Sequence, residues 1–418
     1  MTASQYDVVV AGGGPGGATL AARLAQSGAR VAIFEKEIFP RFHLGESLLP
    51  MSLEIFDKLG VTSQFHDRFI RKNGAWFVDG RNGDEVVFKF REALRQGFPH
   101  AFHGPRGEID DVLLKHAQSL GVEVYEGWDV RGPIEEDDGR VRGIRVRSPE
   151  GRDVDVAAMV TVDATGRSAL MSRPGEAKVK TKGLERTLAL FAHFDGCHRM
   201  QGDDEGDIRI VIVPEGWFWV IPFRGNRSSV GIVLRRAALA KVAANLDDAL
   251  NGVIEESPVM RDIMRGSTKV FPVSAAADYS YRVPRSSGDG WLAVGDAAGF
   301  IDPLFSTGFH LAVKGADLAA PAIEKALAEG DVSAERWRAH ERITRHACET
   351  YIGVVQAFYR GDLIELLFQT KKRDMLRKMI TSVLAGDVFH DEDPRWLREI
   401  ERRFPADLGA GEGAGAGA

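Results

Sequence analysis

The chain of 418 residues contains only two cysteines, Cys197 and Cys348, which is too few for a disulfide framework. It also lacks an excess of positive charge. Its formal net charge is −6, which gives no indication of nucleic-acid binding. No apolar run approaches the roughly 20 residues that a membrane-spanning helix requires. The beginning of the chain has neither the basic segment nor the cleavage site of a signal peptide. We therefore expect a cytoplasmic protein without thiol redox chemistry.

The first 35 residues have the pattern of a βαβ unit, with strands predicted over 6–10 and 31–34 and a helix over 18–27. The turn between the first strand and the helix has the spacing G-x-G-x-x-G, formed by Gly12, Gly14 and Gly17, with Pro15 beside them. Such glycines let a pyrophosphate approach the N-terminus of the helix. Glu35, 18 positions after Gly17, is placed to accept hydrogen bonds from a ribose. The pattern predicts a dinucleotide site. It occurs once in the sequence, so we expect no second domain for a nicotinamide cofactor.

Polar residues that follow this unit are further candidates for the same site. Arg41 can pair with a phosphate, and Ser47 in the segment Gly45-Glu46-Ser47 can hydrogen-bond a phosphate or a ribityl group. A polar surface loop is the alternative for this segment. Arg106 begins a predicted helix and is expected to face the nucleotide.

Two later strands end in small and acidic residues that complete the predicted site. Asp163 opens the tight turn Asp163-Ala164-Thr165-Gly166-Arg167, which we place near the adenine. The buried strand over 291–295 leads into Gly295-Asp296-Ala297-Ala298-Gly299, where small residues permit close approach of a ligand and Asp296 can accept from a ribitol hydroxyl. Over residues 6–330 these segments resemble the glutathione-reductase-type flavoproteins of the p-hydroxybenzoate hydroxylase class. The resemblance implies that the dinucleotide is FAD, with Gly299 among its contacts.

Between residues 187 and 284 the pattern changes to strand-like runs separated by turns. Runs over 188–194, 208–213, 217–223 and 229–234 predict an antiparallel meander. A helical pattern follows over 334–384, and the Gly- and Ala-rich end is a low-complexity tail. The predicted fold is α/β: a discontinuous Rossmann-like FAD-binding domain with a parallel sheet (1–76, 102–186 and 285–330), an antiparallel-sheet substrate domain (77–101 and 187–284), a helical region (331–407) and a disordered tail (408–418).

Two motifs distinguish this chain from other flavoproteins of this fold. Trp217-Phe218-Trp219-Val220-Ile221-Pro222 places two indoles at alternate positions of a strand, hence on one face. Phe300 to Gly308 (Phe-Ile-Asp-Pro-Leu-Phe-Ser-Thr-Gly) follows the second glycine segment directly. Together they resemble the signatures W-x-W-x-I-P and F-x-x-P-x-x-S-x-G of the flavin-dependent halogenases. Taken singly, the first is compatible with core packing and the second with an ordinary helix start.

The resemblance implies a role for each of these residues. The first backbone N–H groups of the helix that follows Ser306 lack intrahelical partners and can hold an anion, which the resemblance identifies as chloride or bromide at Thr307 and Gly308. The resemblance further assigns catalysis to Lys72 and Ser306, with Arg71 as the rival of Lys72. It assigns the separation of flavin from substrate to three residues: Trp217, Trp219 and Pro222.

The implied activity is that of a two-component halogenase in secondary metabolism. A separate flavin reductase supplies FADH2, oxygen adds at the flavin C4a, and the resulting hydroperoxide oxidises halide to hypohalous acid that reaches Lys72. Tryptophan halogenases carry a glutamate where this chain has Phe305, which favours an electron-rich phenol or pyrrole, free or tethered to an acyl carrier protein.

The basic stretch over 371–378 either docks such a carrier or is a solvated helix face. The alternative activities on the same fold are those of an FAD-dependent monooxygenase or a prenyl-lipid (geranylgeranyl-type) reductase.

Overall fold

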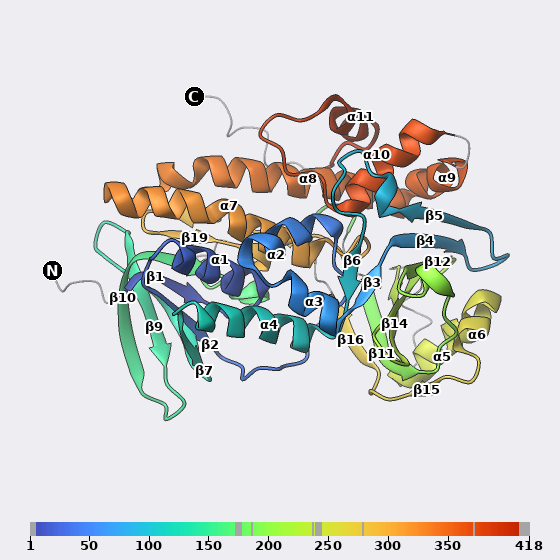
Figure 1. Cartoon of the computed structure of the whole chain (residues 1–418), viewed down its shortest axis with the longest axis horizontal. Helices are drawn as coiled ribbons and strands as arrows, with labels where there is room; N and C mark the ends of the chain where they lie inside the picture. The colour runs from blue at the N-terminus through green and yellow to red at the C-terminus, as the bar shows by residue number, and fades with distance from the viewer. Residues whose placement is uncertain are drawn as a thin grey trace.

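The computed structural model of the chain describes residues 6–171, 178–184, 187–235, 238, 245–277, 280–370 and 373–408. Its architecture is mixed α/β, with two eight-stranded sheets. In Figure 1 the sheet that contains the N-terminal strand lies at the left and the other sheet at the right. Helices α7 (Thr307–Glu329) and α8 (Arg338–Arg360) run along the upper side, from the first sheet towards the second (Figure 1).

The first sheet has the strand order β18-β19-β10-β1-β2-β7, and the pairs from β19 to β7 are parallel. The strands predicted over 6–10 and 31–34 are present and each is one residue longer, which confirms the βαβ unit. Strands β8 and β9 join this sheet through an antiparallel pair with β10. The strands of this sheet are β1 (Tyr6–Ala11), β2 (Val31–Glu35), β7 (Glu123–Glu126), β8 (Asp129–Glu135), β9 (Val141–Arg147), β10 (Asp153–Asp163), β18 (Ser287–Gly288) and β19 (Trp291–Ala293).

Different elements cover the two faces of the first sheet. Because strand side chains alternate, Val8 and Val10 of β1 pack on helices α1, α4 and α7, whereas Val9 packs on β8 and β9. Each buried valine contributes roughly 1.5–3 kcal/mol, so β1 and the glycine turn after it are firmly held. The helices that precede α7 here are α1 (Pro15–Gln26), α2 (Leu53–Leu59), α3 (Thr62–Arg68) and α4 (Arg106–Ser119).

The second sheet has the strand order β15-β11-β14-β13-β12-β4-β5, with β16 also paired to β11. The predicted meander is present, since β12, β13 and β14 pair antiparallel in sequence order and β11 pairs with β14. One pair departs from the prediction, because β4 runs parallel to β12. The strands are β4 (Gly74–Asp79), β5 (Glu85–Lys89), β11 (Leu188–Asp195), β12 (Ile208–Val213), β13 (Gly216–Pro222), β14 (Arg227–Leu234), β15 (Thr268–Lys269) and β16 (Ser274–Ala277).

The alternation along β13 divides the core of the second sheet into two parts. Trp217, Trp219 and Ile221 pack on the side of helices α8 and α10 (Asp374–Ala385). Phe218 and Val220 face helices α5 (Leu246–Glu256) and α6 (Pro258–Met264) on the other side. The two indoles therefore share one face, as the sequence predicts.

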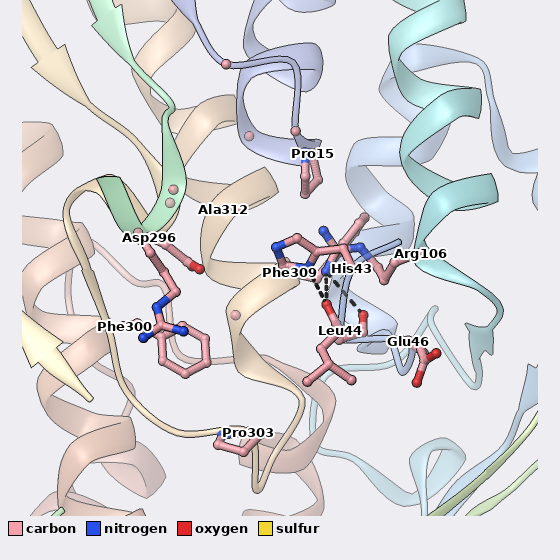
Figure 2. A pocket seen from close by; sticks show the side chains of 18 of the residues that line it. Pro15, His43, Leu44, Glu46, Arg106, Asp296, Phe300, Pro303, Phe309 and Ala312 are labelled. Carbon is pink, nitrogen blue, oxygen red and sulfur yellow. Dashed lines mark hydrogen bonds between the residues drawn. The ribbon is translucent and has the colours of Figure 1, made fainter. Parts of the chain in front are cut away.

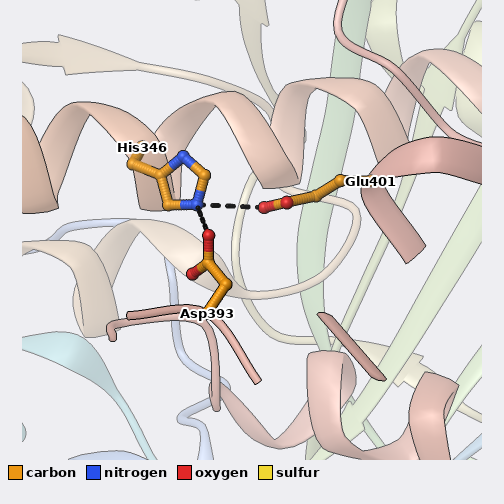
Figure 3. Close-up of side chains that lie close together, drawn as sticks. All are labelled: His346, Asp393 and Glu401. Carbon is orange, nitrogen blue, oxygen red and sulfur yellow. Dashed lines mark ion pairs between the residues drawn. The ribbon is translucent and has the colours of Figure 1, made fainter. Parts of the chain in front are cut away.

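The C-terminal helices are α8, α9 (Asp362–Gln369), α10 (Asp374–Ala385) and α11 (Arg395–Arg403). They fall largely within the predicted helical region. Ion pairs of His346 connect α8 with α11 and with the segment before it (Figure 3). Nε2 of His346 in α8 lies 3.1 Å from Oε1 of Glu401 in α11 and 2.8 Å from Oδ2 of Asp393, which precedes α11. Thr350 of α8 also donates to Oε1 of Glu401 at 2.7 Å.

One predicted domain boundary differs from the course of the strands. The boundary placed after residue 76 falls inside β4, since the whole of Gly74–Asp79 belongs to the second sheet. Residues 409–418 of the predicted tail, and Lys371 and Lys372 of the basic stretch, lie outside the described residues. Cys197 and Cys348 are both free thiols. Among the described helices, none combines the length and apolar character that would let it cross a membrane.

Candidate active site

A cavity of about 650 Å³ is lined by residues from both sheets and from the start of α7. In Figure 2, Pro15 and Pro303 lie at opposite ends of the view, and Asp296 and Arg106 approach from opposite sides. Most predicted site residues line this cavity: Gly12, Gly14, Pro15, Glu35, Arg41, Ser47, Arg106, Trp217, Trp219, Asp296, Ser306, Thr307 and Gly308. The other five stand behind its wall: Gly17, Lys72, Asp163, Pro222 and Gly299.

The glycine turn at the start of α1 leaves no room for side chains. Gly12 has φ +104°, and a Cβ there would lie 2.3 Å from the carbonyl oxygen of Ala164. A Cβ on Gly17 would lie 2.0 Å from the carbonyl oxygen of Gly12. Helix α1 has no side-chain cap and no acidic residue in its first turn. Its first N–H groups are thus left for an anion in the cavity.

Glu35 ends β2 and has two kinds of contact. It lines the cavity, and its carboxylate also accepts hydrogen bonds from the backbone N–H groups of Gly13 (2.7 Å) and Glu37 (2.9 Å). Part of its hydrogen-bonding capacity therefore fixes the glycine turn.

Arg41 and Arg106 meet at one buried carboxylate. Nη1 of Arg41 donates to Asp110 at 2.9 Å, and Nε and Nη2 of Arg106 donate to the same carboxylate at 2.9 and 3.0 Å. Burial alone would raise the pKa of Asp110, but the two guanidinium groups outweigh burial and lower that pKa. Arg106 also donates to the carbonyl oxygen of Leu44 at 2.7 Å (Figure 2). This cluster carries a net positive charge at the cavity wall and holds the segment before Ser47.

Lys72 ends β3 (Ile70–Lys72), which pairs with β6 (Ala101–His103). Its side chain is buried, and Nζ donates to Oγ of Ser47 at 2.9 Å and to the carbonyl oxygen of Leu48 at 3.1 Å. Burial lowers the pKa of Lys72 to about 7, against the opposing charge of Asp207. Its rival Arg71 points to the other side of the strand and is exposed. Ser47 is therefore the residue that joins Lys72 to the cavity.

The two indoles form one wall of the cavity. Their ring centroids are 6.0 Å apart at an interplanar angle of 51°, and both side chains are buried. Nε1 of Trp219 donates to Oγ of Ser229 at 3.1 Å, and a Cβ on Gly231 would lie 2.3 Å from the Trp219 ring. Pro222 ends β13 and supports the strand from outside the cavity.

The turn from Pro303 to Gly308 brings the start of α7 to the cavity. Ser306 is in the left-handed region at φ +57°, which costs a residue with a side chain roughly 1–2 kcal/mol. Thr307 is the first residue of α7, and no side chain caps this end of the helix. A Cβ on Gly308 would lie 2.9 Å from the ring of Phe300. Phe305 is buried against Phe358, with centroids 6.3 Å apart.

The second glycine segment presents one acidic side chain to the cavity. Asp296 lines it, and burial raises the pKa of its carboxyl group to about 6 against the charges of Arg106 and Arg167. No hydrogen bond or ion pair joins that carboxyl group to another described residue, so it is open to a ligand hydroxyl.

Asp163 and Gly299, which the sequence predicts as contacts of the cofactor, do not line the cavity. The carboxylate of Asp163 accepts hydrogen bonds from the backbone N–H groups of Thr165 (3.0 Å) and Met171 (2.9 Å). It shapes the turn whose residues 164–168 line the cavity. Gly299 belongs to the short strand β20 (Gly299–Phe300), which pairs with β17 (Tyr281–Arg282).

The structure adds residues that the sequence reasoning missed. Phe191, Ala189 and Ile208 line the cavity beside the indoles from strands β11 and β12. The alternating pattern of these strands was a usable signal for them. Tyr359 contacts both site motifs, through Trp217 and Asp302, without lining the cavity. No sequence pattern connects a tyrosine near the end of α8 with β13.

The tryptophan halogenase family matches residues 7–96 and 88–375 of this chain. The 1H-pyrrole-2-carbonyl-(peptidyl-carrier protein) chlorinase of Pseudomonas fluorescens is 30% identical over 412 residues, which cover 93% of this chain and 91% of that protein. The tryptophan 2-halogenase of Chondromyces crocatus is 33% identical over 329 residues, covering 78% of this chain and 62% of that protein. The structure of the flavin-dependent brominase Bmp2 superposes with a TM-score of 0.86 at 27% identity, covering 95% of this chain and 98% of the brominase. The chain therefore belongs to the tryptophan halogenase family of flavin-dependent, oxidoreductase-type enzymes.

Proposed function

We propose that this protein is a two-component FADH2-dependent halogenase of electron-rich aromatic compounds. One observation carries the proposal: the glycine turn, the indole wall and the turn at Ser306 line a single cavity, and Ser47 in the same wall contacts Lys72. The residues that we assign to the flavin, to the halide and to halogen transfer thus lie next to one another, which supports halide oxidation followed by delivery to a substrate.

The cavity fits FAD by its own geometry. The turn at Gly12 and Gly17 is too close to its neighbours to carry a Cβ, and the start of α1, which has no side-chain cap, lines the cavity. The charge of Arg41 and Arg106 lies near this turn and suits a pyrophosphate. The carboxyl group of Asp296 suits a ribitol hydroxyl. We assign FAD binding to these residues together with Glu35.

The start of α7 suits a halide. Thr307 and Gly308 belong to the first turn of a 23-residue helix that has no acidic residue in that turn. The helix dipole and the unpaired N–H groups favour an anion there. We assign chloride or bromide to this position, with Ser306 beside it.

Bound reduced flavin supplies the two electrons that activate oxygen. Per FADH2, one O2, one halide ion and one proton are consumed, and FAD, hypohalous acid and water are formed. The indole wall keeps the aromatic substrate from the flavin, so the oxidant travels to Lys72. With a pKa of about 7, Lys72 is present as both ammonium and amine near neutral pH. The ammonium donates to the oxidant and the amine accepts the halogen as a haloamine. Electrophilic substitution then replaces a ring hydrogen by the halogen.

The proposed substrate class rests on the residue at position 305, which is a phenylalanine and not a glutamate. Phe305 is buried in the apolar core, so this position offers no carboxylate to stabilise charge on a weakly activated ring. An activated ring such as a phenol or a pyrrole fits better. The chlorinase relative is named for a pyrrole carried by a peptidyl-carrier protein, which supports a carrier-tethered substrate and a carrier protein as partner. The single glycine turn in the sequence supports a separate flavin reductase as the source of FADH2.

The decisive experiment is mass spectrometry of products. Phenol and pyrrole substrates, free and carrier-bound, and in separate reactions free tryptophan and a prenyl lipid, are incubated with the protein, FAD, a flavin reductase, NADH and either chloride or bromide. A mass gain of one halogen per ring is expected. Hydroxylated products without halogen would support the monooxygenase alternative, and reduced isoprenoid chains would support the prenyl-lipid reductase. Halogenated free tryptophan, the substrate type of the second relative, would correct the substrate class alone.

A further inference from the structure

A short chain of hydrogen bonds connects the indole wall with the turn at the start of α7. Nε1 of Trp217 donates to the hydroxyl oxygen of Tyr359 at 3.2 Å. The same hydroxyl donates to Oδ2 of Asp302 at 3.0 Å. The other carboxylate oxygen, Oδ1, accepts from the backbone N–H of Leu304 at 2.9 Å. Strand β13, helix α8 and the turn are thereby joined at one hydroxyl group.

The two residues that Tyr359 connects, Trp217 and Asp302, have few other polar partners. Trp217 and Asp302 are each 1% exposed. Within the described part of the chain, Asp302 forms no ion pair with a lysine, arginine or histidine, and Trp217 Nε1 has Tyr359 as its acceptor. Without the Tyr359 hydroxyl, a buried donor and a buried acceptor would lose their partner, which is costly in a site that water does not reach.

Asp302 also shapes the backbone on the cavity side. Its bond to the N–H of Leu304 begins the turn, and the N–H of Ser306 continues it by donating to the carbonyl oxygen of Pro303 at 3.1 Å. The strained φ of Ser306 follows at once. A strained residue keeps its conformation only when its surroundings enforce it, and the bond from Tyr359 to Asp302 is part of that enforcement.

We infer that Tyr359 is a positioning residue of the halogenase reaction, whose hydroxyl fixes the indole wall relative to the turn that presents Ser306 and Thr307. This inference rests on the proposed function. Tyr359 and Asp302 do not line the cavity, so they act through Trp217 and the turn and not by contact with the reactants.

The expected consequence is control over where the oxidising equivalents go. In the coupled reaction each FADH2 and O2 consume one halide ion and one proton and give hypohalous acid, FAD and water. In the uncoupled reaction the same FADH2 and O2 give FAD and hydrogen peroxide, and halide is not consumed. A misplaced turn weakens halide binding and thereby favours the second outcome.

The test compares two Tyr→Phe variants of helix α8. Tyr359→Phe keeps the ring, which packs edge-on against Phe358 at 5.9 Å, and removes only the hydroxyl. Tyr351→Phe is the matched control, because its buried hydroxyl donates to the carbonyl oxygen of Val383 at 3.2 Å and does not contact the wall or the turn. Three quantities are measured on the holoenzymes: FAD affinity, bromide affinity from the change of the flavin absorption band, and halogenated product per FADH2 oxidised.

We expect Tyr359→Phe to bind FAD as the wild type does and to bind bromide roughly tenfold more weakly. The yield of halogenated product per FADH2 should fall, and hydrogen peroxide should account for the FADH2 that no longer gives product. Asp302→Asn retains an oxygen that can accept from the N–H of Leu304. It should therefore lose less bromide affinity and less product per FADH2 than Tyr359→Phe. Tyr351→Phe should be less stable but fully coupled. If Tyr359→Phe matches Tyr351→Phe in bromide affinity and coupling, the inference is wrong. A wild-type enzyme without any bromide response would overturn the proposed function as well.

Discussion

Lys72 and Ser47 share a hydrogen bond across the wall of the cavity, with Nζ of Lys72 2.9 Å from Oγ of Ser47. Ser47 lines the cavity and Lys72 does not. The lysine is also covered by the ring of Phe90, 5.2 Å from Nζ. In the proposed mechanism an oxidant in the cavity would therefore reach the Ser47 hydroxyl before it reaches the Lys72 amine.

This arrangement predicts that Lys72 can be removed without loss of the flavin site. Lys72→Met should reduce halogenated product at least about 100-fold, because no amine remains to carry the halogen. FAD affinity and the halide-dependent reoxidation of FADH2 should stay at wild-type values. Arg71→Met is the neighbouring control, since that side chain is exposed and should be dispensable. Wild-type product yield from Lys72→Met would remove Lys72 from the mechanism.

The burial of Lys72 also predicts a pH-dependent effect on stability. Its pKa falls from 10.5 to about 7 on folding, so between these values the unfolded chain binds one more proton than the folded protein. The free energy of unfolding therefore rises with pH in this window, by about 1.4 kcal/mol per pH unit. Lys72→Met lacks this dependence.

Urea denaturation of wild type and Lys72→Met at pH 6 and pH 9 measures the effect. The difference in unfolding free energy should shift by roughly 2–3 kcal/mol in favour of the wild type at the higher pH. The same difference at both pH values would mean that Lys72 titrates as an exposed lysine does.

The glycine turn predicts a separate loss of cofactor binding. Gly17→Ala would place a methyl group 2.0 Å from the carbonyl oxygen of Gly12, so the turn must open. We expect FAD affinity to fall at least about 100-fold, as judged by titration with the flavin fluorescence. Gly252→Ala is the control: this glycine lies inside α5 with open space around its Cβ. It should bind FAD normally and gain roughly 0.5–1 kcal/mol of stability. Tight FAD binding by Gly17→Ala would show that the turn does not need its present geometry.

Local patterns predicted the parts of the site that depend on neighbours in sequence. The glycine spacing predicts the turn at Gly12, and the alternation over 217–223 predicts the common face of Trp217 and Trp219. Both follow from backbone geometry within a few residues. The resemblance to halogenases added Lys72, which as an isolated lysine has no sequence signal.

Long-range contacts set the rest, and the sequence does not reveal them. The parallel pairing of β4 with β12 joins segments more than a hundred positions apart, and no periodicity encodes it. Asp163 follows a buried strand like a ligand-binding residue, yet its carboxylate accepts hydrogen bonds from nearby backbone N–H groups and does not line the cavity. Only the tertiary packing of α8 brings Tyr359 next to Trp217 and Asp302.

The backbone conformation of Ser306 predicts that one substitution, Ser306→Gly, has opposite effects on stability and on product yield. Glycine adopts positive φ without the steric cost that Ser306 pays at φ +57°, so Ser306→Gly should raise the free energy of unfolding by about 1 kcal/mol. If its hydroxyl assists catalysis, halogenated product per FADH2 should fall. Ala169→Gly is the matched control, because Ala169 is the other described non-glycine residue in this region, at φ +47°, and does not line the cavity. It should keep full yield, and its gain in stability should be smaller because the substitution also removes a methyl group that is buried against Tyr281 and Val283. Thermal denaturation and product analysis of both variants separate the two effects, and full yield from Ser306→Gly would limit that residue to shaping the turn before Thr307.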